Sequence, residues 1–148
     1  MPQSYTKLLY HIVFSTKDRT PLIHDGITNR LYPYIRSLYH QRGGSVLAIN
    51  GTDDHLHTLA QLRQDRAVSD VIRDIKAVSS GWMHKNGERS FGWQKGYGGF
   101  TVSHSQRGQA QAYIENQRLH HRKRAFQAEF EMLLRAHGID FDERYLWV

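Results

Sequence analysis

Hydrophobic residues follow a strand-like pattern in four stretches of the 148-residue chain. Residues 7–16 are rich in β-branched and aromatic side chains and predict a mostly buried strand. Residues 45–50 and 55–62 predict two more strands, which the short turn-like segment between them should join as an antiparallel hairpin. Residues 91–103 mix aromatic residues with glycines, so we expect a fourth strand with a glycine-rich bend or bulge.

Four other stretches repeat their apolar residues at helical spacing. The first two cover residues 28–41 and 71–83, and each ends shortly before a glycine that can terminate a helix. Pro33 should be tolerated only in the first turns of its helix, because proline lacks the backbone N–H that helix interiors use. Two further helices are predicted over residues 106–119 and 123–136, and the large apolar residues of the tail should dock somewhere on the domain.

Up to residue 103 the predicted order is strand, helix, strand, strand, helix, strand. This order is typical of the α+β ferredoxin-like βαββαβ fold, in which helices cover one face of an antiparallel sheet. The two C-terminal helices are additions to that core. No linker or repeat divides the chain, so residues 1–148 are expected to form a single domain.

Composition limits the compartment and the class of partner. Cysteine is absent, which excludes disulfides and thiolate chemistry, and the N-terminus lacks a signal peptide pattern, so we expect a cytoplasmic protein without a membrane span. The net charge of +6 and the pI near 9.7 favour an anionic partner, with nucleic acid as the first candidate. Tyrosine and tryptophan side chains offer stacking surfaces for unpaired bases.

A His-x-His pair stands in the middle of the predicted hairpin. In a strand, His55 and His57 point to the same face, which suits two ligands of one metal ion, and Asp53 and Asp54 can orient the imidazoles. Two half-exposed histidines on an ordinary strand are the competing interpretation. His11, which alternates with apolar neighbours on the first strand, is interpreted as structural or as lining a nucleic-acid groove.

The predicted helix over residues 106–119 carries Tyr113 and Gln117, which are four residues apart and therefore project from one face. A hydroxyl nucleophile and a neutral oxygen ligand are presented together. Packing of an amphipathic tyrosine is the alternative. Tyr97, flanked by glycines, is a rival nucleophile, although packing over a glycine bend is the favoured interpretation for it.

Taken together, the His55 and His57 pair after Asp54, the strand after Gly96, and the Tyr113 to Gln117 segment resemble the single-tyrosine HUH transposases of small bacterial insertion sequences. The resemblance implies that His55, His57 and Gln117 hold a divalent metal, Mg or Mn, while Tyr113 attacks DNA. It also implies cleavage and rejoining of single-stranded DNA folded as hairpins, through a 5′-phosphotyrosine intermediate. The resemblance further implies a homodimer in which the tyrosine helix can complete the partner's site.

Charge near the tyrosine predicts the DNA contacts, with an ordinary solvated helix face as the alternative interpretation. Basic residues gather after it, with few acids among them, and one lysine precedes the last strand. The predicted DNA-binding residues are Lys95, Arg107, Arg118, His120, His121, Arg122, Lys123 and Arg124.

Other functions stay open at this point. One is a replication-initiation nickase or a host-adapted relative that processes repeated hairpins, and another is an inactive DNA-binding relative that keeps the fold. A histidine-dependent nucleotide hydrolase would need a third histidine at the position of Leu59, so the sequence argues against that class.

Overall fold

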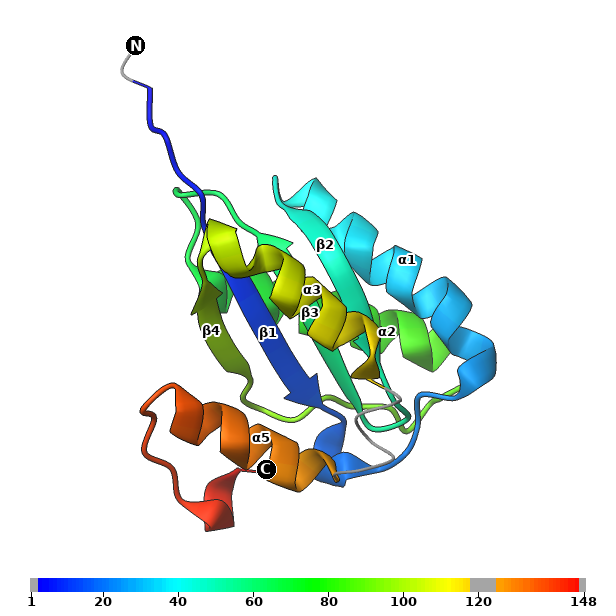
Figure 1. Ribbon diagram of the computed structural model, residues 1–148. Coiled ribbons are helices and arrows are strands. Elements are labelled where there is room, and N and C mark those ends of the chain that lie inside the picture. Colours follow the sequence, from blue (N-terminus) through cyan, green and yellow to red (C-terminus); the bar gives the residue numbers. More distant parts are fainter. Residues whose placement is uncertain (1–2, 118–124, 147–148) are drawn as a thin grey trace.

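Four strands form one antiparallel sheet between the helices (Figure 1). The structure is a computed structural model that describes residues 3–117 and 125–146. The strand order is β2-β3-β1-β4, and all neighbouring strands are antiparallel. The strands are β1 (Leu9–Ser15), β2 (Ser45–Gly51), β3 (His55–Gln61) and β4 (Gly98–Val102). With a helix after β1 and another after β3, this order confirms the predicted ferredoxin-like fold.

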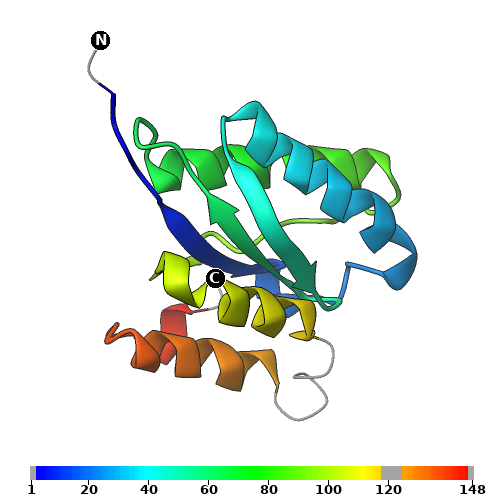
Figure 2. The ribbon, with the colours of Figure 1, turned by 45° about the horizontal axis from the view of Figure 1, so that its top comes forward.

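Helices α1 (Asp25–Gln41) and α2 (Val68–Lys85) cover one face of the sheet (Figure 2). They bury their apolar stripes against every second residue of the strands, among them Phe14 on β1 and Leu56 on β3. The alternate residues of the same strands point to the opposite face. The large core on the α1 and α2 side therefore leaves the other side of β1 and β3 available for a second layer.

Helices α3 (Arg107–Glu115) and α5 (Phe126–Ala136) form that second layer (Figure 2). On α3, Ile114 is fully buried in a cluster with Ala48 and Leu59. The apolar stripe of α5 packs against β1 and β4 in a separate cluster. Its buried members are Val13, Phe100, Phe126, Phe130 and Leu134. The described residues also include three short 3-10 helices: η1 (Lys17–Arg19), η2 (His104–Gln106) and η3 (Glu143–Tyr145).

Several predicted boundaries were wrong. Helix α1 begins at Asp25, so Pro33 lies in its interior, where a stripe of five buried side chains compensates the lost backbone hydrogen bond. Helix α3 ends at Glu115, and Asn116 forms a turn. The predicted strand over residues 91–103 is reduced to β4, although Trp93 still forms an isolated bridge with Thr16.

The tail docks as expected. Phe141 and Leu146 pack against the α5 cluster, and the Gln94 side chain donates a hydrogen bond to the Leu146 carbonyl at 3.1 Å. Among the residues that the structure describes, no helix is both long and apolar enough to cross a membrane.

Candidate active site

His55 and His57 both point from β3 toward the α3 and α5 layer. Their neighbours in sequence, Leu56 and Thr58, point the other way, where Leu56 joins the main core and Thr58 bonds the Tyr39 hydroxyl at 2.9 Å. The predicted common face of the two imidazoles follows from this alternation. Both histidines are fully buried, so the interpretation of them as half-exposed strand residues was wrong.

The loop before β3 fixes the orientation of His55. The Nδ1 atom of His55 donates to Asp54 Oδ1 at 2.9 Å, because a carboxylate can only accept. The Thr52 hydroxyl donates to the same oxygen at 3.0 Å, and Phe126 stacks on the imidazole at 4.0 Å between ring centroids. Asp53 does not share this role, because its side chain is exposed. With Nδ1 engaged by Asp54, the Nε2 atom of His55 is the ring nitrogen that faces the site.

A third histidine performs the corresponding task for His57. The Nε2 atom of His11 lies 2.7 Å from His57 Nδ1, a diagonal contact between β1 and β3. Burial, followed by the charge of His57, lowers the pKa of His11 to about 3, so His11 is neutral at physiological pH. His11 is therefore more than the structural or groove-lining residue that the sequence predicts, because it fixes the ring of a candidate ligand.

Helix α3 brings Tyr113 and Gln117 over the same part of the sheet. Its burial of Ile114 fixes which face of the helix meets β2 and β3, and the Asn50 side chain donates to the Glu115 carbonyl at 2.9 Å. Beyond the turn at Asn116, Gln117 is fully buried, and its Oε1 lies 3.2 Å from His55 Nε2. Within the described residues, Gln117 Nε2 has no hydrogen-bond partner, so the amide directs its oxygen, rather than its donor group, at the imidazole.

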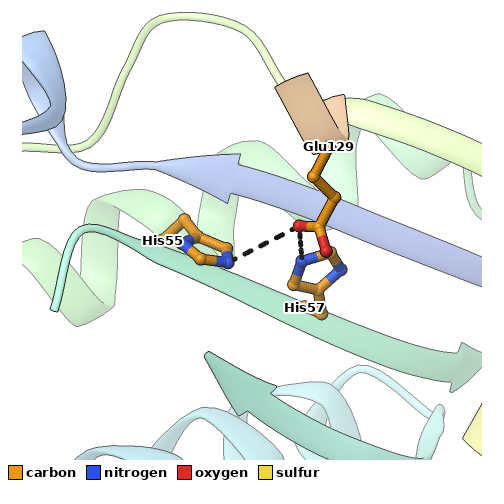
Figure 3. Close-up of side chains that lie close together, drawn as sticks. All are labelled: His55, His57 and Glu129. Atoms are coloured by element: carbon orange, nitrogen blue, oxygen red, sulfur yellow. Dashed lines mark hydrogen bonds and ion pairs between the residues drawn. The ribbon is translucent and has the colours of Figure 1, made fainter. Parts of the chain in front are cut away.

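Glu129 enters the cluster from α5 (Figure 3). The carboxylate is buried, and its Oε1 lies 3.0 Å from His57 Nε2 and 3.8 Å from His55 Nε2. Its second oxygen accepts a hydrogen bond from the Tyr113 hydroxyl at 2.5 Å. One carboxylate thus connects the histidine pair with the candidate nucleophile.

The donor set fits a divalent cation. His55, His57 and Glu129 each offer a ligand atom, and these atoms all lie within 4.8 Å of one another. The two Nδ1 atoms are already engaged by Asp54 and His11, so both Nε2 atoms converge on the Glu129 carboxylate. Imidazole nitrogen with amide and carboxylate oxygen suits Mg²⁺, Mn²⁺ or another first-row metal. These residues therefore form a candidate metal centre.

The structure describes two of the eight predicted DNA-binding residues. Lys95 and Arg107 are exposed, and neither belongs to the histidine cluster. Lys95 lines a cavity beside α2, and Arg107 begins α3 with its guanidinium donating to the His104 carbonyl at 2.7 Å. The remaining predicted residues lie outside the described part of the chain: Arg118, His120, His121, Arg122, Lys123 and Arg124.

Tyr97 packs against the α1 and α2 core, on the face of the sheet opposite the histidines. Its ring lies beside Gly99, where an added Cβ would come within 3.3 Å of Tyr97 Cε2, and partial burial raises its pKa. The structure supports the interpretation of Tyr97 as a packing residue.

Sequence reasoning missed His11 and Glu129 as members of the cluster. Glu129 carries a recognisable signal: it interrupts the apolar stripe of its helix, three residues after Phe126, at a position that should be apolar. His11 carries a weaker one, because its strand alternates so that His11 and Val13 share a face. Neither signal predicts which residues His11 and Glu129 contact, because those contacts depend on the strand order and on where the helices pack.

Comparison with known proteins places this arrangement in a family. Residues 4–117, from the segment before β1 through Gln117, match the family described as IS200-like transposases. The chain belongs to the IS200-like transposase family. Membership makes it a transposase, a class of enzyme that cuts DNA, and the sequence resemblance is thereby confirmed. The matched region includes His11, the histidine pair and Tyr113, whereas Glu129 lies beyond it.

Relatives of this transposase cover most of its length. The ISDra2 transposase TnpA of Deinococcus radiodurans is 28% identical over 118 residues, which span 75% of this chain and 84% of the relative. A crystal structure from Deinococcus radiodurans R1, of a protein described as a transposase, has a TM-score of 0.64 and 27% identity, covering 79% of this chain and 96% of the other.

A REP-associated tyrosine transposase, solved with a bound REP hairpin, has a TM-score of 0.59. The two chains are 18% identical over 78% of this chain and 70% of the other, so this similarity concerns the fold.

Proposed function

We propose that this transposase cleaves and rejoins single-stranded DNA, with Tyr113 as the nucleophile and a divalent metal held by His55, His57 and Gln117. One observation carries the proposal: the Tyr113 hydroxyl and His57 Nε2 meet the same buried carboxylate, at 2.5 Å and 3.0 Å. The candidate nucleophile and the candidate metal ligands therefore belong to one continuous cluster. A tyrosine that merely packed on the sheet would need no such connection.

The reaction that suits these groups is a transesterification. The Tyr113 oxygen attacks the phosphorus, the bond to the 3′ oxygen breaks, and the DNA is left with a 5′-phosphotyrosine and a free 3′ hydroxyl. The tyrosine gives up one proton and the departing 3′ oxygen takes one up, so no proton is consumed overall. Because the new ester conserves the phosphodiester, a DNA 3′ hydroxyl can reverse the step without an energy source. Cutting and joining are thus the same chemistry.

A bound divalent metal would neutralise phosphate charge and stabilise the departing oxygen. The chain's own contribution is to orient the groups. Asp54 and His11 fix the two imidazoles from behind, and Gln117 directs its amide oxygen at His55. We assign His55, His57 and Gln117 as ligands on this basis.

We further propose that the DNA reaches the site from the side of Tyr113. The tyrosine is half-buried, whereas the other members of the cluster are buried beneath α3 and α5. Lys95 and Arg107 are exposed and, with the basic segment after residue 117, are proposed to contact the DNA backbone. A REP hairpin bound to a structural neighbour supports a hairpin as the first substrate to try.

The proposal is tested with labelled single-stranded hairpin DNA and Mn²⁺, followed by denaturing electrophoresis. A covalent protein–DNA adduct should form with the natural protein and vanish in Tyr113→Phe. The matched control, Tyr97→Phe, should form the adduct normally, because that ring lies on the opposite face of the sheet. An adduct that persists in Tyr113→Phe, or disappears in Tyr97→Phe, would overturn the assignment of the nucleophile.

A further inference from the structure

The C-terminal helix places an acid where its helical pattern calls for an apolar residue. Glu129 is 2% exposed, and the other buried residues of α5 are the apolar Phe126, Phe130 and Leu134. Burying a carboxylate costs several kcal/mol unless charged or hydrogen-bonding partners compensate it. An aliphatic residue would fill the same position without that cost, so the carboxylate must be explained by what it contacts.

The contacts of Glu129 are specific to the outward-facing atoms of the histidine pair. Its Oε1 lies 3.0 Å from His57 Nε2 and 3.8 Å from His55 Nε2. The Nδ1 atoms of these rings are bonded elsewhere, to His11 and Asp54. The Nε2 atoms are therefore the ring nitrogens that remain available to Glu129. The carboxylate lies where both imidazoles direct the nitrogens that ligate metals.

The spacing of these atoms is close to that of ligands around one ion. Neighbouring ligands of an octahedral ion with bonds of about 2.0–2.1 Å lie roughly 2.9 Å apart, and tetrahedral ligands at the same bond length roughly 3.3 Å apart. The His57–Glu129 and His55–Gln117 distances are 3.0 Å and 3.2 Å, and the His55–Glu129 distance is 3.8 Å. The first two distances match these values, as ordinary hydrogen bonds also do, and the third is longer. The three distances join the four atoms into one continuous group.

The second carboxylate oxygen, Oε2, accepts a hydrogen bond from the Tyr113 hydroxyl. The residue that reaches the metal ligands therefore also sets the position of the proposed nucleophile.

We propose that Glu129 is a fourth ligand of the metal ion and, through its other oxygen, a positioning residue for Tyr113. This inference rests on the proposed function, and it extends the metal site into α5, beyond the region that matches the family. An anionic oxygen added to two imidazoles and an amide strengthens the binding of hard divalent ions. The carboxylate extends from α5 toward both imidazoles (Figure 3).

Calorimetric titration with Mn²⁺ tests the ligand directly, without DNA and without catalysis. Glu129→Gln keeps the shape of the side chain and removes its charge, and it should weaken Mn²⁺ binding by about 10-fold to 100-fold. The matched control is Glu131→Gln on the same helix, outside the cluster, which should bind Mn²⁺ within about twofold of the natural protein. Thermal unfolding without metal checks that both variants fold. Glu129→Asp keeps the charge but shortens the side chain, so its affinity for Mn²⁺ should lie between those of Glu129→Gln and Glu131→Gln.

The positioning role is tested by single-turnover cleavage at saturating Mn²⁺. Glu129→Gln should lower the cleavage rate while leaving the affinity for hairpin DNA unchanged. Unchanged Mn²⁺ affinity in Glu129→Gln, together with its loss in His57→Ala, would overturn this inference and leave the proposed function intact. Faster cleavage by Glu129→Gln would also overturn it, because Glu129 would then inhibit the reaction rather than position Tyr113. Absence of Mn²⁺ binding by the natural protein would overturn both.

Discussion

Replacement of Gly98 by alanine should separate α5 from the sheet and thereby disturb the candidate site. Gly98 lies on β4 opposite Val13, and it is buried. A Cβ added there would lie 2.7 Å from Phe130 Cε1 and 3.3 Å from Phe130 Cζ. Carbon atoms in good contact are about 3.5–4.0 Å apart, so the ring must move by roughly 1 Å. The absence of a side chain at Gly98 is what lets α5 approach β4 so closely.

The magnitude follows from how little room Phe130 has. The ring is 4% exposed and packs within a cluster that also holds Phe126 and Leu134. Overpacking of such a site costs about 1–3 kcal/mol in the free energy of unfolding. For a chain of this size, a loss of about 2 kcal/mol lowers the Tm by roughly 4–8 °C. Because Glu129 directly precedes Phe130, the shift also moves the carboxylate, so the affinity for Mn²⁺ should fall as well.

Thermal and urea unfolding measure the effect, with Gly108→Ala as the matched control. An added Cβ at Gly108 meets nothing within 4 Å, and the residue lies in helix α3. The control should therefore be more stable than the natural protein by about 0.4–1 kcal/mol. In the Gly98→Ala background, Phe130→Leu should recover part of the loss, because it removes the clashing ring atoms. Gly98→Ala with a Tm at or above that of the natural protein would refute the reasoning.

Three further predictions concern α3 and the assembly of the site. Asn50→Ala removes the hydrogen bond to the Glu115 carbonyl and should cost about 1 kcal/mol in urea unfolding, with slower single-turnover cleavage; an unchanged cleavage rate would contradict it. Ile114→Ala leaves a cavity under α3 and should cost about 2–4 kcal/mol in the same assay, whereas a loss below about 1 kcal/mol would mean that α3 is not anchored there. Mixing Tyr113→Phe with His57→Ala should not restore cleavage, because one chain supplies both groups; restored activity would show a homodimer with exchanged tyrosine helices.

The fold could be predicted from sequence because its elements are short and strongly patterned. Alternation along β1 and β3 separates a core face from a second face, and this alone sets His55 and His57 side by side. Helical spacing likewise groups Tyr113 with Gln117, although the helix ends at Glu115. Despite this boundary error, Gln117 still reaches His55 from beyond the turn at Asn116.

The contribution of α5 could not be predicted from the same patterns. Glu129 lies more than seventy residues from His57, and only packing of the helix on β1 and β4 brings the two together. That packing depends on Gly98, whose missing side chain carries no periodic signal. The contact between His11 and His57 depends in turn on which strands are neighbours in the sheet. When tertiary packing brings a residue into a site, the sequence shows it only as a local exception to the pattern, such as an acid in an apolar stripe.

Mass spectrometry of the protein–DNA adduct tests the central claim most directly. After reaction with hairpin DNA and Mn²⁺, nuclease digestion leaves a short nucleotide on the attacking residue, and trypsin separates the two candidate tyrosines. Residues 108–118 carry Tyr113, and residues 96–107 carry Tyr97. We predict the added nucleotide on the Tyr113 peptide, with fragment ions that locate it on the tyrosine. A nucleotide on the Tyr97 peptide, or cleaved DNA without any modified peptide, would contradict the account.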